Sequence, residues 1–208
     1  MNSKGKFITI EGGEGAGKST NIGFIQTFLA EQGIELISTR EPGGTVYAEK
    51  IRNLLLDHNN EPLDAMAELL LIFAARAQHL NQLILPALNQ GKWVLCDRFT
   101  DATYAYQGAG RKLGMSKVSD LENLVQGSLR PDLTLILDIP VEIGMERVAG
   151  RGEFDRFESE QHEFFESVRQ SYLELARAAP ERYAVIDTCN SLEQVQSEVA
   201  LILQRLLS

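Results

Sequence analysis

The sequence is poor in the residues that build metal sites and disulfide frameworks. Its two cysteines, Cys96 and Cys189, lie far apart and form no Cys-x-x-Cys motif. Its three histidines, His58, His79 and His162, show no metal-ligand spacing. These absences argue against a zinc-binding domain and against a disulfide-stapled secreted protein, and they favour a reducing compartment.

Long apolar runs are missing as well. No stretch approaches the eighteen or so apolar residues that a membrane helix needs, and the first residues lack the basic and then apolar pattern of an export signal. We therefore expect a cytoplasmic protein without a membrane partner.

Basic residues are outnumbered by acidic ones, with 20 Lys and Arg against 29 Asp and Glu and a net charge of −9. A surface for a nucleic-acid polymer normally shows a basic face, so no such partner is expected. Several basic residues nevertheless stand at the ends of predicted elements. Their placement indicates a local positive pocket for a small polyanion. These residues are Lys18, Arg40, Arg52, Arg76, Arg98, Arg151 and Arg156.

Short apolar runs alternate with helical stretches along the chain. The runs predict parallel strands at about 7–11, 34–39, 93–97, 133–138 and 183–187. Helices are expected near 18–32, 44–57, 63–90, 100–108, 117–127, 141–149, 158–178 and 191–206. Pro86 should kink the long one, and Ser191 with Gln194 should form a capping box. The pattern predicts one α/β domain over residues 1–208, with a five-stranded parallel sheet and helices on both faces.

Residues 12 to 19 read Gly-Gly-Glu-Gly-Ala-Gly-Lys-Ser and follow a predicted strand, which is the pattern of a phosphate-binding loop. Backbone N–H groups of such a loop cradle phosphates, Lys18 reaches the β- and γ-phosphates, and the Ser19 hydroxyl binds Mg²⁺. An ordinary Gly-rich turn is the alternative. The predicted ATP-binding residues are Gly12, Gly13, Glu14, Gly15, Ala16, Gly17, Lys18, Ser19 and Thr20.

The apolar strand at 93–97 ends in the pair Asp97-Arg98, at the sheet edge where ligands of such folds bind. Asp97 can hold Mg²⁺ directly or through water, and Arg98 can grip a phosphate with two hydrogen bonds. The alternative is structural: Asp97 or Thr100 caps the next helix and Arg98 forms its salt bridge.

Arg76 falls on the apolar stripe of the long helix, in register with Leu69, Ile72 and Leu80. A buried and unpaired guanidinium is costly. Arg76 must therefore pair with a carboxylate, reach water, or hydrogen-bond a ligand.

The segment Gly150-Arg-Gly-Glu-Phe-Asp-Arg156 interrupts two helical patterns with two glycines and two arginines. A mobile lid that closes over a triphosphate has this composition, and we expect a lid at about 150–157. A plain interhelical loop is the alternative. Arg151 and Arg156 would stabilise the charge that develops during phosphoryl transfer, beside Lys18 and Arg98 as the other catalytic residues.

Over essentially its whole length the sequence resembles thymidylate kinases. Besides the phosphate loop and residues 151–156, the resemblance includes Phe73-Ala-Ala-Arg76, and its most specific segments are Thr39-Arg-Glu-Pro-Gly-Gly44 and Asp97-Arg98-Phe99 with Ala105-Tyr-Gln-Gly108. The resemblance implies a three-layer fold of the P-loop nucleoside monophosphate kinases. It also implies Mg²⁺-dependent transfer of the γ-phosphoryl of ATP to dTMP, and a homodimer.

The same resemblance implies roles for residues of the acceptor site. Arg40, Arg52 and Arg98 match arginines that bind the acceptor, and Arg76 and Gln107 match residues that hydrogen-bond the thymine edge. With Glu14 in the loop and arginines in the lid, the chain resembles the lid type common in bacteria. Many relatives have Phe at the position of Ile72, so either Ile72 or its neighbour Phe73 covers the thymine ring. Many also have Ser at the position of Ala102, so that hydroxyl contact is either lost or taken over by Thr103. Glu11 is a further residue expected at the dTMP site.

Two rival functions stay open. A deoxynucleoside kinase would need a base for its hydroxyl acceptor, a role that Asp97 or Glu11 could fill. A GTPase-type switch is disfavoured because the sequence has no Asn-Lys-x-Asp segment.

Overall fold

The computed structural model describes residues 5–57, 63–149 and 160–207. Its centre is a five-stranded sheet with the order β2-β3-β1-β4-β5, in which all neighbouring strands are parallel. The strands are β1 (Phe7–Glu11), β2 (Leu36–Arg40), β3 (Trp93–Asp97), β4 (Leu133–Asp138) and β5 (Tyr183–Asp187). The predicted parallel sheet is confirmed, and four of its five strands have the predicted bounds.

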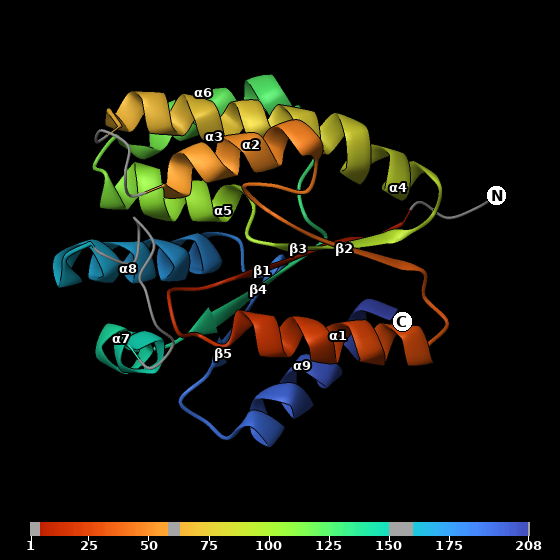
Figure 1. The fold of residues 1–208 in the computed structure, drawn as a ribbon. Coiled ribbons are helices and arrows are strands. Elements are labelled where there is room, and N and C mark those ends of the chain that lie inside the picture. The colour runs from red at the N-terminus through yellow and green to blue at the C-terminus, as the bar shows by residue number, and fades with distance from the viewer. Residues whose placement is uncertain (1–4, 58–62, 150–159, 208) are drawn as a thin grey trace.

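Helices cover both faces of this sheet (Figure 1). Helices α1 and α9 lie on one face, and α2 to α6 lie on the other. The helices are α1 (Lys18–Glu31), α2 (Val46–Leu56), α3 (Ala65–His79), α4 (Leu85–Asn89), α5 (Thr100–Thr103), α6 (Met115–Gln126), α7 (Val141–Ala149), α8 (His162–Ala178) and α9 (Leu192–Leu207), with π-helical segments η1 (Leu80–Ile84) and η2 (Tyr104–Gly110).

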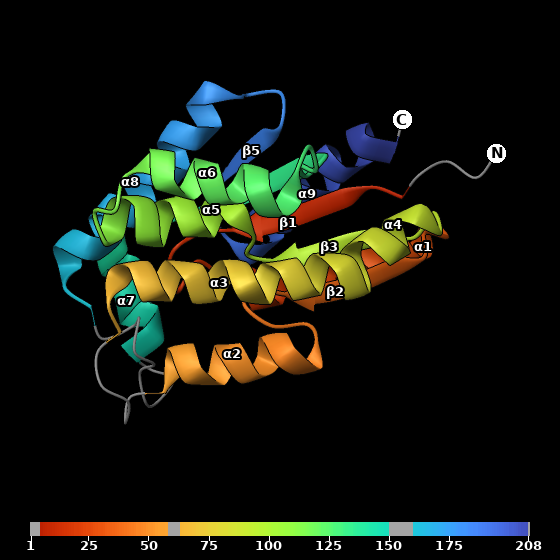
Figure 2. The same ribbon diagram turned by 90° about the horizontal axis from the view of Figure 1, so that it is seen from above.

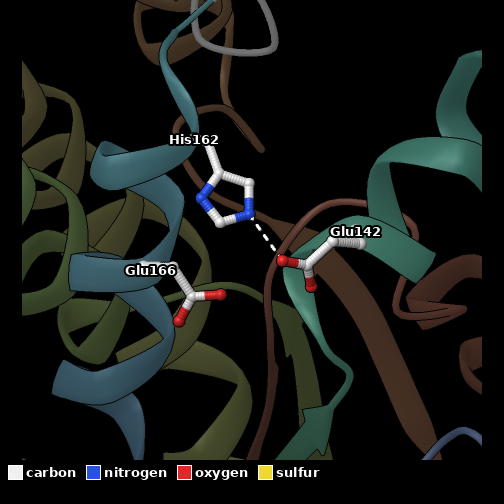
Figure 3. A group of neighbouring side chains, drawn as sticks. All are labelled: Glu142, His162 and Glu166. Carbon is white, nitrogen blue, oxygen red and sulfur yellow. Dashed lines mark hydrogen bonds and ion pairs between the residues drawn. The ribbon is translucent and has the colours of Figure 1, made fainter.

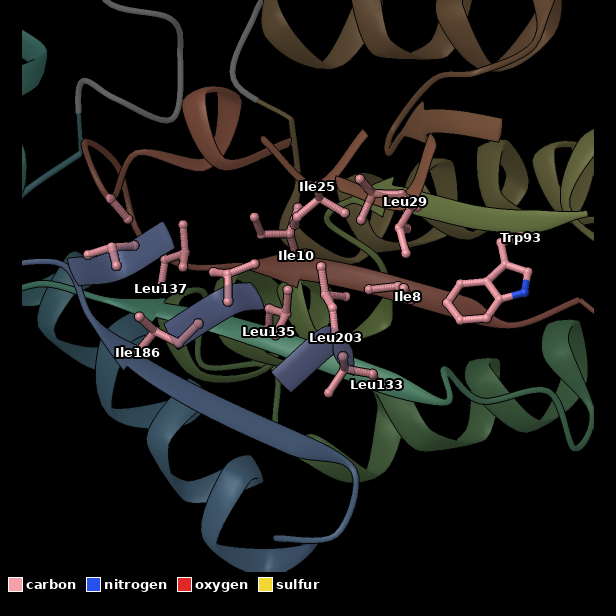
Figure 4. Close-up of a cluster of buried hydrophobic side chains, with 14 of the residues drawn as sticks. Ile8, Ile10, Ile25, Leu29, Trp93, Leu133, Leu135, Leu137, Ile186 and Leu203 are labelled. Atoms are coloured by element: carbon pink, nitrogen blue, oxygen red, sulfur yellow. The ribbon is translucent and has the colours of Figure 1, made fainter. Parts of the chain in front are cut away.

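The alternation of side chains along the buried strands explains the two-sided core. In β1, Ile8 and Ile10 point into a cluster with α1 and α9, whereas Phe7 belongs to a cluster on the opposite face. Figure 4 shows Ile25 and Leu29 of α1 among the side chains of the first cluster. Parallel strands covered on both faces are apolar throughout, which is why the sequence runs predicted them.

Two local expectations have clear outcomes. Ser191 and Gln194 form the predicted capping box: each backbone N–H donates to the other side chain, at 3.1 and 3.3 Å. The long predicted helix is made of α3, η1 and α4, and its π-helical turn ends at Ile84, two residues before Pro86. Because proline lacks an N–H and its ring crowds the preceding turn, the wider turn accommodates it.

Within the described ranges, none of the helices combines the length and apolarity that crossing a membrane requires. The carboxyl ends of β1, β2, β3 and β4 meet at one edge of the sheet, because all four strands run in the same direction. Loops that follow these ends therefore come together, and they form the site described next.

Candidate active site

The phosphate loop connects β1 to α1, as its sequence pattern requires. Gly17 adopts φ 85° and caps α1, and Gly15 adopts φ 70°. A Cβ atom on Gly15 would lie 2.1 Å from the carbonyl oxygen of Gly144 in α7, so only glycine fits there. The Lys18 ammonium donates to the carbonyl oxygens of Gly12 and Gly13, both at 3.0 Å. The loop carbonyl groups therefore hold the Lys18 ammonium, and residues 14–20 of the loop line the cavity beside it.

This cavity has a volume of about 290 Å³ and is lined by residues of the phosphate loop, β2, α2, α3, β3 and η2. The structure brings most of the predicted site residues to its wall. They are Glu14, Gly15, Ala16, Gly17, Lys18, Ser19, Thr20, Arg40, Arg52, Ile72, Arg76, Asp97, Arg98, Thr103 and Gln107.

Other predicted site residues do not line this cavity. Glu11, Gly12, Gly13 and Phe73 are described but are not among the residues that line it. The predicted lid arginines Arg151 and Arg156 lie outside the described residues.

Asp97 and Ser19 line the same cavity. Asp97 Oδ1 is buried and has no hydrogen-bond partner among the described residues. A carboxylate oxygen without a partner, together with a nearby hydroxyl, matches the hard oxygen donors that Mg²⁺ prefers. The donor set therefore fits the magnesium ion that the sequence predicts at these two residues.

Arg98 adopts a left-handed backbone with φ 65°, and its amide donates to the Ile10 carbonyl oxygen at 3.0 Å. Its Nη2 donates to Glu14 Oε1 at 2.6 Å, and its guanidinium lies 4.7 Å from the ring centre of Tyr106. Helix α5 is capped by Phe99 without a side-chain hydrogen bond. The structural alternative from the sequence, with Asp97 or Thr100 as cap and Arg98 as ion-pair partner of that cap, is thus not what forms.

Glu14 and Glu11, three positions apart, have opposite electrostatic environments. Burial favours the neutral form of Glu14, but Arg98 and Lys18 outweigh it and lower the pKa of Glu14 to about 2. Burial and the nearby Asp101 raise the pKa of Glu11 to about 8. Glu14 is therefore ionised at neutral pH, whereas Glu11 holds its proton to a higher pH than an ordinary glutamate does.

Glu11 supports the turn that carries Arg98. Its Oε1 accepts the Phe99 amide at 2.6 Å, and its Oε2 accepts the Tyr172 hydroxyl at 2.9 Å. This contact holds the residue directly after Arg98, so Glu11 acts on the cavity through the backbone of that turn.

Arg76 is buried, with a side-chain exposure of 1%. Its Nε donates to Glu41 Oε2 at 2.7 Å, and its Nη2 donates to the Phe99 carbonyl oxygen and the Thr103 hydroxyl. Its Nη1 is buried and has no partner in the described part of the chain. Of the three outcomes open in the sequence, Arg76 pairs with a carboxylate, and it keeps one nitrogen available at a cavity that it lines.

Comparison with known proteins identifies the family. The family model described as thymidylate kinase matches residues 10–199. The thymidylate kinase of Ectopseudomonas mendocina is 59% identical over 203 residues, which are 98% of this chain and 97% of the relative. That of Teredinibacter turnerae is 58% identical, over 98% of this chain and 99% of the relative. The chain belongs to the thymidylate kinase family.

The crystal structure of thymidylate kinase from Ehrlichia chaffeensis superposes with a TM-score of 0.78 at 35% identity, and covers 97% of this chain and 99% of that chain. The resemblance and the expected fold, that of a P-loop nucleoside monophosphate kinase, are confirmed. Members of the thymidylate kinase family are phosphotransferases that use ATP as donor and dTMP as acceptor, so the predicted enzyme class is confirmed too.

Two residues were both candidates for covering the acceptor base in this thymidylate kinase family member. Ile72 lines the cavity. Phe73 packs with Leu69 and Val118 and places its ring 4.7 Å from the Arg76 guanidinium. Ile72 is therefore the one of the two that lines the cavity, and Phe73 packs against the Arg76 guanidinium.

Several residues in and around the site could not be recognised from the sequence. Glu41 lies in the Arg-Glu-Pro-Gly-Gly segment, but nothing local shows that its carboxylate pairs with Arg76. Tyr106 donates from its hydroxyl to Glu14 Oε1 at 2.7 Å. His79 follows Arg76 by three residues, and this spacing on one helix face was the available signal.

Another group of possible ligands lies outside the cavity. Ligand atoms of Glu142, His162 and Glu166 all lie within 4.8 Å of one another, from α7 and α8 (Figure 3). His162 Nε2 already contacts Glu142 at 2.8 Å, and both side chains are more than half exposed. A solvent-exposed ion pair between two helices accounts for this arrangement.

Proposed function

We propose that this chain transfers the γ-phosphoryl group of ATP to the 5′-phosphate of dTMP, with Mg²⁺, in the cytoplasm. One observation carries the assignment of the site. A phosphate loop and a buried arginine with an available nitrogen line one cavity, which supports the binding of a triphosphate and a second nucleotide end to end.

The donor end consists of the phosphate loop. Lys18 and the amides of residues 12–20 bind the phosphates of ATP, and Ser19 and Asp97 hold Mg²⁺. When bound, the magnesium ion neutralises charge on the β- and γ-phosphate oxygens. Lys18, now held by two loop carbonyl oxygens, exchanges these for phosphate oxygens.

The acceptor phosphate is bound by Arg98, with Arg40 and Arg52 beside it. Arg52 Nη1 donates to the Pro42 carbonyl oxygen at 2.9 Å, which places this side chain at the wall of the cavity. Because the acceptor phosphate is anionic at neutral pH, no general base is needed and the protein supplies alignment and charge.

The base end holds the thymine ring. Arg76 Nη1, Thr103 and Gln107 supply polar contacts, and Ile72 supplies an apolar one. Gln107 is itself held by Glu68, whose Oε1 accepts from its Nε2 at 2.7 Å. Phe73 and Glu11 contribute through Arg76 and Arg98. A guanidinium N–H offers only a donor, which suits a keto group on the base.

Residues 150–157 are proposed to act as the lid, with Arg151 and Arg156 binding the charge that develops on the transferred group. The flanking helix α7 lies against the phosphate loop, since Gly144 of α7 packs directly against Gly15. Positive charge at this point stabilises the loose transition state of phosphoryl transfer.

The proposed homodimer is supported by exposed apolar side chains on three neighbouring helices. Helix α3 contacts both α2 and α6 and lies between them (Figure 2). Val46 and Tyr47 on α2, Leu70 on α3 and Leu124 on α6 are 50 to 79% exposed. A second copy of this chain would cover them. Light scattering should show a dimer that Leu124→Glu weakens, and a monomeric wild type would contradict this part.

Acceptor choice tests the function. With ATP and Mg²⁺, we expect rapid conversion of dTMP to dTDP and no product from thymidine. Faster phosphorylation of thymidine would instead indicate a deoxynucleoside kinase with Asp97 as its base. Hydrolysis of GTP with neither acceptor phosphorylated would point to a switch.

A further inference from the structure

His79 lies at the end of α3 and its side chain is completely buried, with an exposure of 0%. Both ring nitrogens have partners. Nδ1 lies 2.9 Å from Glu41 Oε1, and Nε2 lies 2.7 Å from Thr39 Oγ1. His79 does not line the cavity, so any effect on a ligand passes through these neighbours.

Glu41 connects this histidine to the arginine of the base end. One carboxylate oxygen faces His79 and the other accepts from Arg76 Nε. A carboxylate accepts hydrogen bonds, so Nδ1 carries the proton and donates to Glu41. The contacts therefore form a chain from Thr39 through His79 and Glu41 to the Arg76 guanidinium.

The loop after β2 rests on the same imidazole. A Cβ atom on Gly44 would lie 2.5 Å from His79 Nε2 and 2.5 Å from Thr39 Oγ1, and Gly44 adopts φ 82°. Pro42 and Glu41 of this loop line the cavity. One buried ring thus sets the position of both the loop and the arginine.

We propose that His79 is a positioning residue for recognition of the acceptor base, acting through the hydrogen bond from Nδ1 to Glu41. With Nε and Nη2 already engaged, the direction of Arg76 Nη1 depends on where Glu41 holds the guanidinium plane. The rings of Phe73 and Phe99, at 4.7 and 5.0 Å, restrain its tilt but not its rotation within that plane. The two acceptors of Nη2 restrain that rotation from one side, and the hydrogen bond from His79 restrains it from the other by holding the Glu41 carboxylate that accepts from Nε. This inference rests on the proposed function.

Two substitutions separate the ring nitrogens. In His79→Asn the amide reaches the position of Nδ1 and still donates to Glu41. In His79→Gln the longer amide reaches the position of Nε2 and contacts Thr39 instead. We expect His79→Gln to lower kcat/KM for dTMP about tenfold or more, through KM, because small misplacements of a binding group are costly. The KM for ATP should stay unchanged, and His79→Asn should keep most of the affinity for dTMP.

A merely structural role gives another result. Both variants would then lose thermal stability to a similar extent, and the folded fraction of each would show the wild-type KM for dTMP, which would overturn the inference. If the wild type itself does not phosphorylate dTMP, the proposed function fails instead.

Gly44→Ala provides a second test if His79→Gln does not fold. Its Cβ would lie 2.5 Å from both His79 Nε2 and Thr39 Oγ1, so it must disturb the contact between them without removing any polar group. A raised KM for dTMP with an unchanged KM for ATP supports the proposal, and an unchanged KM for dTMP contradicts it.

Discussion

Among the described residues, two contacts between a histidine and a glutamate differ mainly in burial. His79 and Glu41 are 0% and 3% exposed, at the base end of the cavity. His162 and Glu142 are 56% and 64% exposed, between α7 and α8. The distances are almost equal, at 2.9 and 2.8 Å. The distances alone therefore do not show which of the two contacts contributes more to stability.

Burial changes what each contact is worth. Water competes for the exposed pair and screens it, so the loss of one partner costs little. Around the buried pair, Glu41 also neutralises Arg76, and removal of one partner leaves a charge in a poor solvent. We therefore expect the buried cluster of His79, Glu41 and Arg76 to matter more for stability and function than the exposed pair. The substitutions below test this expectation, together with one at the buried Glu11.

Glu41→Ala should have the largest effect, because it leaves the Arg76 guanidinium buried without a carboxylate. We expect a loss of about 3–5 kcal/mol in unfolding free energy, measured by urea denaturation. Glu142→Ala is the matched control from the exposed pair and should unfold like the wild type. Equal losses in the two variants would break the comparison.

Arg76→Lys keeps a positive charge beside Glu41 but removes the planar group that offers Nη1 to the cavity. We expect kcat/KM for dTMP to fall by about 10- to 100-fold, because lysine does not replace an arginine fixed by several directed hydrogen bonds. Steady-state kinetics with dTMP varied at saturating ATP measure this. A wild-type KM for dTMP would show that the available nitrogen does not bind the base.

Glu11→Gln examines a buried carboxyl group that forms no ion pair within the described part of the chain. Because the folded-state pKa is raised from 4.5 to about 8, the folded protein holds a proton that the unfolded chain loses. Stability from this group is present at low pH and is lost as pH rises from 4.5 toward 8. Urea denaturation across this range should show a flatter pH dependence for Glu11→Gln than for the wild type. Parallel curves would contradict the assignment.

His162→Ala should have the smallest effect. The exposed contact with Glu142 is screened, so the melting temperature should stay within experimental error of the wild type. A clear loss of stability would show that exposure is the wrong criterion for ranking the two pairs.

How far the sequence predicts the site depends on how local the contacts are. The phosphate loop is built from consecutive residues, so its pattern predicts its place between a strand and a helix and the kind of ligand that it binds. The strands of the sheet are predicted equally well, because each of them corresponds to a short, mainly apolar run in the sequence. The base end combines segments around Glu41, Arg76 and Thr103, which meet only after β2 pairs with β3 and α3 packs beside them.

This difference explains why the sequence left Arg76 with three possible outcomes and did not single out His79. A buried charge on an apolar stripe predicts that a partner exists, but its identity is tertiary information. For the same reason, Ile72 and Phe73 could not be told apart until the rotation of α3 about its axis was known.

In the proposed function one cavity binds two nucleotides, ATP at the phosphate loop and dTMP at the end that contains Arg76. Calorimetric titration of dTMP, and separately of a non-hydrolysable ATP analogue with Mg²⁺, tests it in Lys18→Ala and Arg76→Lys. We predict that Lys18→Ala loses affinity for the analogue and most of kcat but binds dTMP like the wild type, and that Arg76→Lys loses affinity for dTMP alone. Equal weakening of both ligands by either substitution in a folded protein would contradict the account.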